Sequence, residues 1–171
     1  MSFYAEVLSA LSTGGPVPRD DVRRWIDSGD LLAWSALFTL LDATPKRVRP
    51  ELPPEEQREL ARRYLLRCIE ENPTPGEHLH AGFEAAWELA GVMQQWRHAG
   101  GRAAAAIRRT AVDLEKIYRR GDAAVKSRIA CGVLEHAFED ASIRQVFAAW
   151  DRDDDLREAY KLATDWGAAH E

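Results

Sequence analysis

The chain has 171 residues, of which 46% are apolar and 30% charged, and it contains six tryptophans. This composition is typical of one folded domain and excludes a disordered chain, because large aromatic rings need a core. The formal net charge of −5 makes nucleic acid an unlikely partner, since binding to a phosphate backbone depends on a basic surface.

The first forty residues predict three helices. An apolar stripe over 3–11 ends at a Gly-Gly-Pro turn, and a short helix then follows Pro18. Asp30 is placed to cap a third helix over 31–41. Because apolar residues surround almost the whole circumference of 31–41, this helix is expected to be central and buried.

The segment 44–54 contains four prolines and is expected to be a loop that ends where Pro54 opens the next helix. In that helix, which stops at Asn72-Pro73, apolar residues recur at the three-and-four spacing of one face. Four arginines occupy the other face, which predicts an amphipathic surface helix. They are Arg58, Arg62, Arg63 and Arg67.

Thr74 and Glu77 have the spacing of a capping box, so a helix is expected to begin there and to reach about His98. Glu77 and His80 also have the Glu-x-x-His spacing of di-iron bundles, but such a site needs a second copy. We therefore prefer the capping interpretation and expect no metal and no cofactor. The residues expected to face inward are Leu79, Phe83, Ala86, Trp87, Ala90 and Met93.

Gly100-Gly101 divides the chain into possible sub-halves, 1–99 and 102–171, which are expected to share one core. Beyond it, a helix ends at Gly121 and Asp122 caps the next, so the two predict a helical hairpin. Shorter helices follow. With about nine helices and almost no alternating strand pattern, we expect one all-α domain over 1–171. Its architecture is expected to be an irregular helical bundle or a short HEAT-like stack.

Cysteine usage and hydropathy indicate a reduced compartment. Cys68 and Cys131 lie inside apolar helical patterns and are expected to be reduced core residues. The first residues lack the basic and apolar regions of a signal peptide, and no apolar run reaches the length of a membrane span. A cytoplasmic location away from the membrane is expected.

Catalytic patterns are weak, so we expect no enzyme activity. Glu135 and His136 are adjacent on a helix and point about 100° apart, which prevents them from acting together on one proton. His136 follows the apolar face and is interpreted as a hydrogen-bonded core histidine. No phosphate-binding loop, G-x-S-x-G or H-E-x-x-H pattern is present.

Charge is unevenly distributed along the second half of the chain. Residues 97–128 hold nine basic and three acidic side chains, and residues 135–171 hold ten acidic and four basic ones. These charges can be solvated faces that pair with one another, and one or two acids can cap a helix. The surplus beside Trp150 instead predicts an acidic surface with an aromatic anchor for a basic partner. The predicted partner-binding residues are Glu135, Glu139, Asp140, Trp150, Asp151, Asp153, Asp154 and Asp155.

Segment 118–156 combines a Gly-Asp turn and a Leu-Glu pair with spaced apolar residues. They are Tyr118-Arg119-Arg120-Gly121-Asp122, Val125, Gly132-Val133-Leu134-Glu135, Phe138-Glu139, Phe147, Trp150 and Leu156. This pattern resembles the C-terminal part of small all-helical bacterial immunity proteins. The resemblance implies an antitoxin in the cytoplasm that occludes the active site of a cognate polymorphic or contact-dependent toxin, one with a basic active-site face.

Two other functions stay open on the sequence. A helical-repeat adaptor or regulatory subunit would also bind a protein partner, and a cryptic enzyme or metal protein is the third possibility. Neither the identity of the partner nor self-association of the chain follows from the residues.

Overall fold

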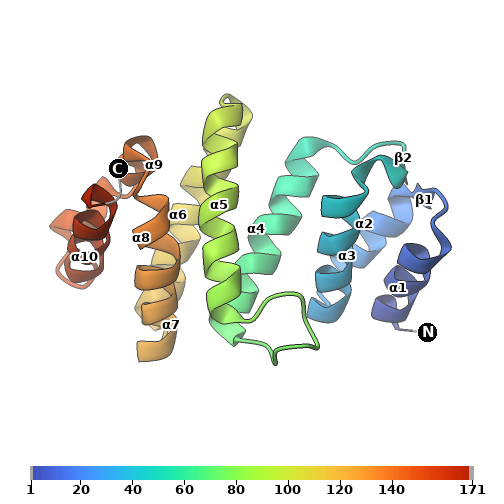
Figure 1. Ribbon diagram of the computed structural model, residues 1–171, viewed down its shortest axis with the longest axis horizontal. Helices are drawn as coiled ribbons and strands as arrows, with labels where there is room; N and C mark the ends of the chain where they lie inside the picture. The colour runs from blue at the N-terminus through green and yellow to red at the C-terminus, as the bar shows by residue number, and fades with distance from the viewer. Residues whose placement is uncertain (1, 170–171) are drawn as a thin grey trace.

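The computed structural model describes residues 2–169, in which nine helices form an elongated array of two layers (Figure 1). The first layer holds α1 (Phe3–Thr13), α3 (Leu31–Ala43), α5 (Gly82–Ala99) and one continuous helix made of α7 (Ala123–Ser127), the π-helical η2 (Arg128–Leu134) and α8 (Glu135–Ala137). The second layer holds α2 (Arg19–Asp27), α4 (Pro54–Glu71) and α6 (Arg102–Arg120). The short α9 (Ala141–Val146), the 3-10 turn η3 (Ala148–Arg152) and α10 (Arg157–Ala168) close the C-terminal end.

Ion pairs between layer-two helices show how the hairpins stack. Arg62 of α4 pairs with Asp113 of α6, 51 positions later, and Glu70 pairs with Arg120, 50 positions later. This nearly constant separation means that α4 and α6 run parallel. Each helix also packs mainly on its near neighbours in chain order. The all-α prediction is confirmed, and of its two architectures the stack of helical hairpins matches this arrangement.

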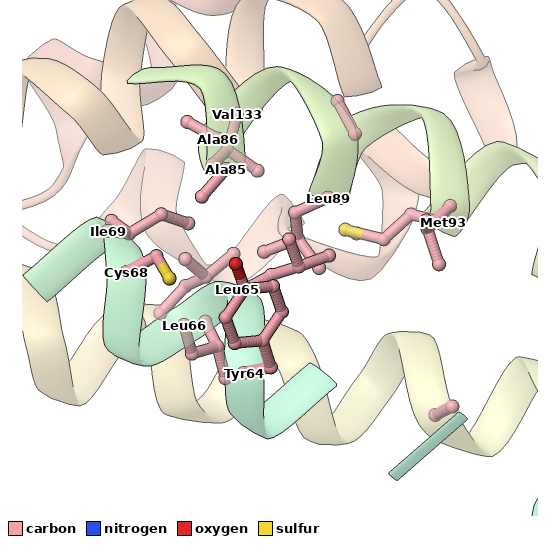
Figure 2. Close-up of a cluster of buried hydrophobic side chains, with 14 of the residues drawn as sticks. Tyr64, Leu65, Leu66, Cys68, Ile69, Ala85, Ala86, Leu89, Met93 and Val133 are labelled. Carbon is pink, nitrogen blue, oxygen red and sulfur yellow. The ribbon is translucent and has the colours of Figure 1, made fainter. Parts of the chain in front are cut away.

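The buried apolar residues form one cluster from Val7 to Ala163, on both sides of Gly100-Gly101. Figure 2 shows its centre, where α4 side chains such as Tyr64 and Cys68 meet Leu89 and Met93 of α5. The predicted apolar face of α4 is buried against α3, α5 and α6, and Arg63 on the other face is exposed, so of the amphipathic prediction only the placement of Arg62 is wrong. Arg62 is accordingly only 8% exposed and pairs with carboxylates of α4 and α6.

Two of the predicted helix starts rest on local hydrogen bonds that are present. The Asp30 carboxylate accepts from the backbone amides of the first turn of α3, and Asp122 accepts from Val125 N at 2.9 Å. Pro54 opens α4 as predicted.

The predicted capping box at Thr74 and Glu77 is wrong. Residues 72–81 form a loop, and α5 begins only at Gly82. The Asn72 side chain accepts from Gly82 N at 3.0 Å, and the Glu84 carboxylate accepts from Ala81 N at 2.9 Å. These contacts fix the start of α5 eight positions after Thr74.

A pair of two-residue strands was not predicted. Strand β1 (Val17–Pro18) pairs in parallel with β2 (Val48–Arg49), which follows the 3-10 turn η1 (Pro45–Arg47). Strands this short have no alternating pattern that a sequence could reveal. They join the segment that follows α3 to the segment between α1 and α2.

Both cysteines are free, but only one is fully buried. Cys68 is buried, and burial raises the pKa of its thiol to about 12. Cys131 is half-buried in η2 and packs against the core from its edge, so the core prediction holds for it only in part. No helix among residues 2–169 combines the length and the hydropathy required to cross a bilayer.

Candidate protein-binding face

The aromatic anchor predicted from the sequence is not on the surface. Trp150 is 3% exposed and packs against Phe147 and Tyr118, with ring centroids 5.5 and 5.7 Å away. Trp150 is therefore a core residue of the C-terminal end, and the interpretation of an exposed anchor is wrong.

The aspartates that follow Trp150 are largely paired within the chain. Arg119 of α6 binds Asp153 at 2.6 Å and Asp155 at 3.3 Å, and the hydrogen bond from Arg119 lowers the pKa of Asp153. Asp154 pairs with Arg157 at 3.0 Å, while Asp151 is exposed. The cluster is thus partly neutralised, and its role in partner binding stays a prediction.

The other predicted acids lie at separate places. Asp140 caps α9 through Ser142 N at 2.8 Å and pairs with Arg97 at 3.2 Å. Glu139 lies 3.5 Å from His136, whose ring is half-exposed and contacts Trp166, so His136 is not the core residue that was expected. Glu135 lies on the outer side of the first layer, beside Cys131.

The first-layer face differs from the rest of the molecule in its charge. We define it as the exposed side of segments 31–43, 72–96 and 129–139, which belong to α3, the 72–81 loop, α5 and η2–α8. These described segments contain no lysine or arginine, although the chain has 23. Their six acidic residues are Asp42, Glu77, Glu84, Glu88, Glu135 and Glu139.

Most carboxylates of the second layer, in contrast, are paired with arginines, and the exceptions among these described helices are Asp20 and Asp27 of α2. Glu56 binds Arg23 at 2.7 Å, Glu70 binds Arg120 at 2.6 Å and Glu55 binds Arg102 at 3.3 Å. No ion pair within residues 2–169 involves four of the first-layer acids. They are Asp42, Glu77, Glu88 and Glu135. The first-layer face therefore combines unpaired carboxylates with the absence of lysine and arginine from its segments, which gives it a negative potential.

Three large apolar side chains stand on this face. Leu79, Phe83 and Trp87 are 49%, 40% and 53% exposed, and the rings of Phe83 and Trp87 lie 6.1 Å apart. The prediction that all three face inward is wrong. The inner side of α5 is filled by Ala85, Ala86, Leu89, Ala90, Val92, Met93 and Trp96. Neighbouring exposed apolar side chains are characteristic of interaction sites.

The aromatic pair lies where α5 meets the next first-layer helix. Phe83 packs over Gly132 of η2, where a Cβ would lie 3.4 Å from Phe83 Cδ1, an ordinary contact distance, but only 2.5 Å from the Cβ of Ala86. Cys131 and Glu135 flank this glycine on the outer side of the helix. Aromatic surface and carboxylates are thus adjacent on two rigid helices.

A groove separates α3 from α5 on the same face. Its volume is about 250 Å³, its walls are Phe38 and Leu41 of α3 and Val92 and Trp96 of α5, and Ala61 of α4 contributes to its floor. In Figure 1 the 72–81 loop lies between the lower ends of α3 and α5. The loop fills that end, and the groove remains where the loop does not reach.

Buried polar contacts hold the loop in place. Leu79 N donates to Ser35 Oγ at 2.7 Å, Tyr64 Oη donates to the same oxygen at 3.2 Å, and His80 Nδ1 lies 3.3 Å from Tyr64 Oη. The His80 ring also meets Phe38 edge-on at 5.4 Å. Burial lowers the pKa of His80, and Glu88 and Glu84 oppose this shift only in part.

Protonation of His80 should therefore weaken the fold. Because its pKa is lower in the folded than in the unfolded chain, His80 contributes stability above its ordinary pKa of 6.5 and loses it as the pH falls through the folded value. Urea unfolding at pH 7.5 and at pH 5 should show a larger loss of stability for the wild type than for His80→Phe. Equal losses would contradict the assigned role of His80.

Residues 2–169 contain no group of three histidine, cysteine or acidic side chains arranged to hold a metal ion. Glu77 is exposed in the loop, whereas the His80 ring contacts Phe38 and Tyr64. The Glu-x-x-His spacing thus does not bring these two groups to one helical face.

Sequence reasoning missed Leu79, Phe83, Trp87 and the groove, although one signal was present. Segment 72–96 has no basic residue, whereas the preceding segment 54–71 is rich in arginine, and this contrast between the two helices is visible in the sequence alone. Comparison with protein-family models, with curated proteins and with solved structures finds no match for this chain.

Proposed function

We propose that the chain is an immunity protein that binds a protein toxin through the first-layer face and occludes its active site. The observation that carries the proposal is the exposed Phe83–Trp87 pair on a face whose segments contain no lysine or arginine. Aromatic side chains on a rigid helix are typical centres of binding energy in protein interfaces. Unpaired carboxylates around them attract a basic surface and speed its encounter.

The family resemblance of segment 118–156 supplies the kind of partner. A toxin with a basic active-site face would be complementary to the acidic first layer, and a bound protein would cover that active site without any reaction by this chain. The stacked helices support this mode, because such arrays present extended surfaces to protein partners. The same architecture also suits an adaptor or regulatory subunit, which would bind a partner without protecting cells from it.

The test uses the protein encoded immediately upstream of this gene, where the resemblance implies a toxin. We expect cells that express it to survive only when this chain is co-expressed. The double variant Phe83→Ser/Trp87→Ser should bind it roughly thirtyfold or more weakly, because two central aromatic side chains are lost. Val112→Ser is the matched control, since Val112 is equally exposed on the second layer.

Cys131 provides a readout of where the partner binds. In the native protein a thiol reagent should modify Cys131, which is half-buried, and leave the buried Cys68 unmodified. Binding over the first-layer face should protect Cys131. Tight binding with Cys131 still reactive and the double variant unaffected would refute the proposed face. Tight binding without rescue of the cells would favour the adaptor.

A further inference from the structure

We infer that the groove between α3 and α5 receives an arginine side chain of the protein partner. This inference rests on the proposed function and specifies the chemistry of the partner at one place on the first-layer face. Three observations carry it: the size of the groove, its apolar walls and the charges at its edges.

The size of the groove suits a side chain. At about 250 Å³ it is smaller than the 300 to 1,000 Å³ typical of sites for small organic ligands. It is also open along the face, so a residue on a docked surface can enter it without a conformational change. A single long side chain is the occupant that this volume and position favour.

The side chains that line the groove are complementary to both parts of an arginine side chain, its methylene groups and its guanidinium group. Leu41 and Val92 offer aliphatic surface to a chain of methylene groups. Phe38 is partly exposed and Trp96 is 7% exposed, so Phe38 offers the larger aromatic surface and Trp96 only its rim to a guanidinium group, which stacks on rings more readily than an ammonium group does.

The charged groups that line the groove have a net charge of −1, which favours a cation as the occupant. Asp42 of α3 and Glu88 of α5 stand on opposite walls, and neither makes an ion pair within residues 2–169. Arg58 of α4 also lines the groove and opposes a second cation. Its guanidinium lies 3.8 Å from Glu55, which neutralises part of that charge.

The chain itself contains the same contact elsewhere. On the second layer, Arg63 stacks over the ring of Trp34 at 4.6 Å and Arg67 approaches it at 5.4 Å, in a depression of about 350 Å³. There, arginines of α4 cover the indole. In the α3–α5 groove, Trp96 has no cation stacked on it within the described residues.

The inference can be tested on the isolated chain with N-acetyl-arginine amide as the probe. We expect titration to shift the Trp96 indole resonance and the amide resonances of Asp42 and Glu88 in ¹H–¹⁵N spectra of the full chain. Asp42→Asn/Glu88→Gln should weaken this binding at least fivefold, and Arg58→Gln should strengthen it. Native spectra of both variants control for folding.

Two further probes and a series of protein concentrations give the opposing outcomes. An equal response to N-acetyl-norleucine amide would overturn the inference, because the groove would then select an apolar stem alone. A stronger response to N-acetyl-lysine amide would also overturn it. Shifts of the groove resonances with protein concentration alone would show that a second copy of the chain is the occupant.

The outcome is separable from the proposed function. If the arginine probe leaves Trp96 unchanged while Phe83→Ser/Trp87→Ser still abolishes toxin binding, the inference fails and the proposed function stands. The opposite result is also possible. If the arginine probe binds as expected, but Phe83→Ser/Trp87→Ser binds the toxin as tightly as the wild type and Cys131 stays reactive in the complex, the proposed function is wrong and the inference about the groove stands.

Discussion

Replacing Phe138 with alanine is expected to lower the free energy of unfolding by about 3 to 5 kcal/mol. Phe138 is fully buried directly after α8, and its ring centroid lies 5.4 Å from that of Phe147 and 5.3 Å from that of Tyr160. The substitution removes the ring that joins α8 to α10 and leaves a cavity between rigid helices. Urea unfolding followed by circular dichroism measures the loss.

Leu162→Ala is the matched control for this prediction. Leu162 lies in α10 as Tyr160 does, but it is 50% exposed, so its truncation should change the stability by no more than about 0.5 kcal/mol. A loss below about 1 kcal/mol for Phe138→Ala would mean that the C-terminal helices do not pack on α8 as described.

A single methyl group at Gly132 is expected to cost about 1 to 3 kcal/mol of stability, because it overpacks the contact between two first-layer helices. A Cβ at this position would lie 2.5 Å from the Cβ of Ala86 in α5, and neither atom can rotate away. The cost arises although alanine favours a helix over glycine by about 1 kcal/mol.

Gly91→Ala should have the opposite sign. Gly91 also lies in a first-layer helix, α5, but a Cβ there would meet no atom within 4 Å. The alanine should therefore raise the stability by up to about 1 kcal/mol through helix propensity. If both variants gain stability in urea unfolding, α5 and η2 do not approach as closely as the structure has them.

The Gly132 variant also affects the candidate site. A methyl group there would meet the Phe83 ring at an ordinary contact distance of 3.4 Å, so its effect on the site comes from the separation of α5 and η2 that the clash with Ala86 requires. The first-layer face thus depends on a residue without a side chain, which no pattern of polar or aromatic residues indicates.

Much of the helical structure could be predicted because helix formation is governed by residues within a few positions of one another. Asp30 and Asp122 mark helix starts through hydrogen bonds two or three residues long, Pro54 marks one through its own fixed backbone dihedral, and these predictions are confirmed. The capping box at Thr74 failed for a non-local reason, since the loop is held by Ser35, 44 positions before Leu79.

The candidate site could be predicted only in part, because exposure and pairing depend on distant residues. Helix α5 carries apolar side chains on more than one of its sides. Its packing against α4 and η2 buries the side that holds the small alanines, and Phe83 and Trp87 are left on the exposed side. Trp150 became a core residue through contacts with Tyr118 and Phe147. Arg119 neutralised Asp153 from 34 positions away.

The sequence by itself determined the all-α class, most helix boundaries and a net negative charge, since these follow from local hydrogen bonds, periodicity and composition. Only the tertiary structure decided which charges remain unpaired and which aromatic rings meet solvent. Hairpins of unequal length place partners 33 positions apart between α2 and α4 but about 50 apart between α4 and α6. No regular period in the sequence could reveal pairings that vary in this way.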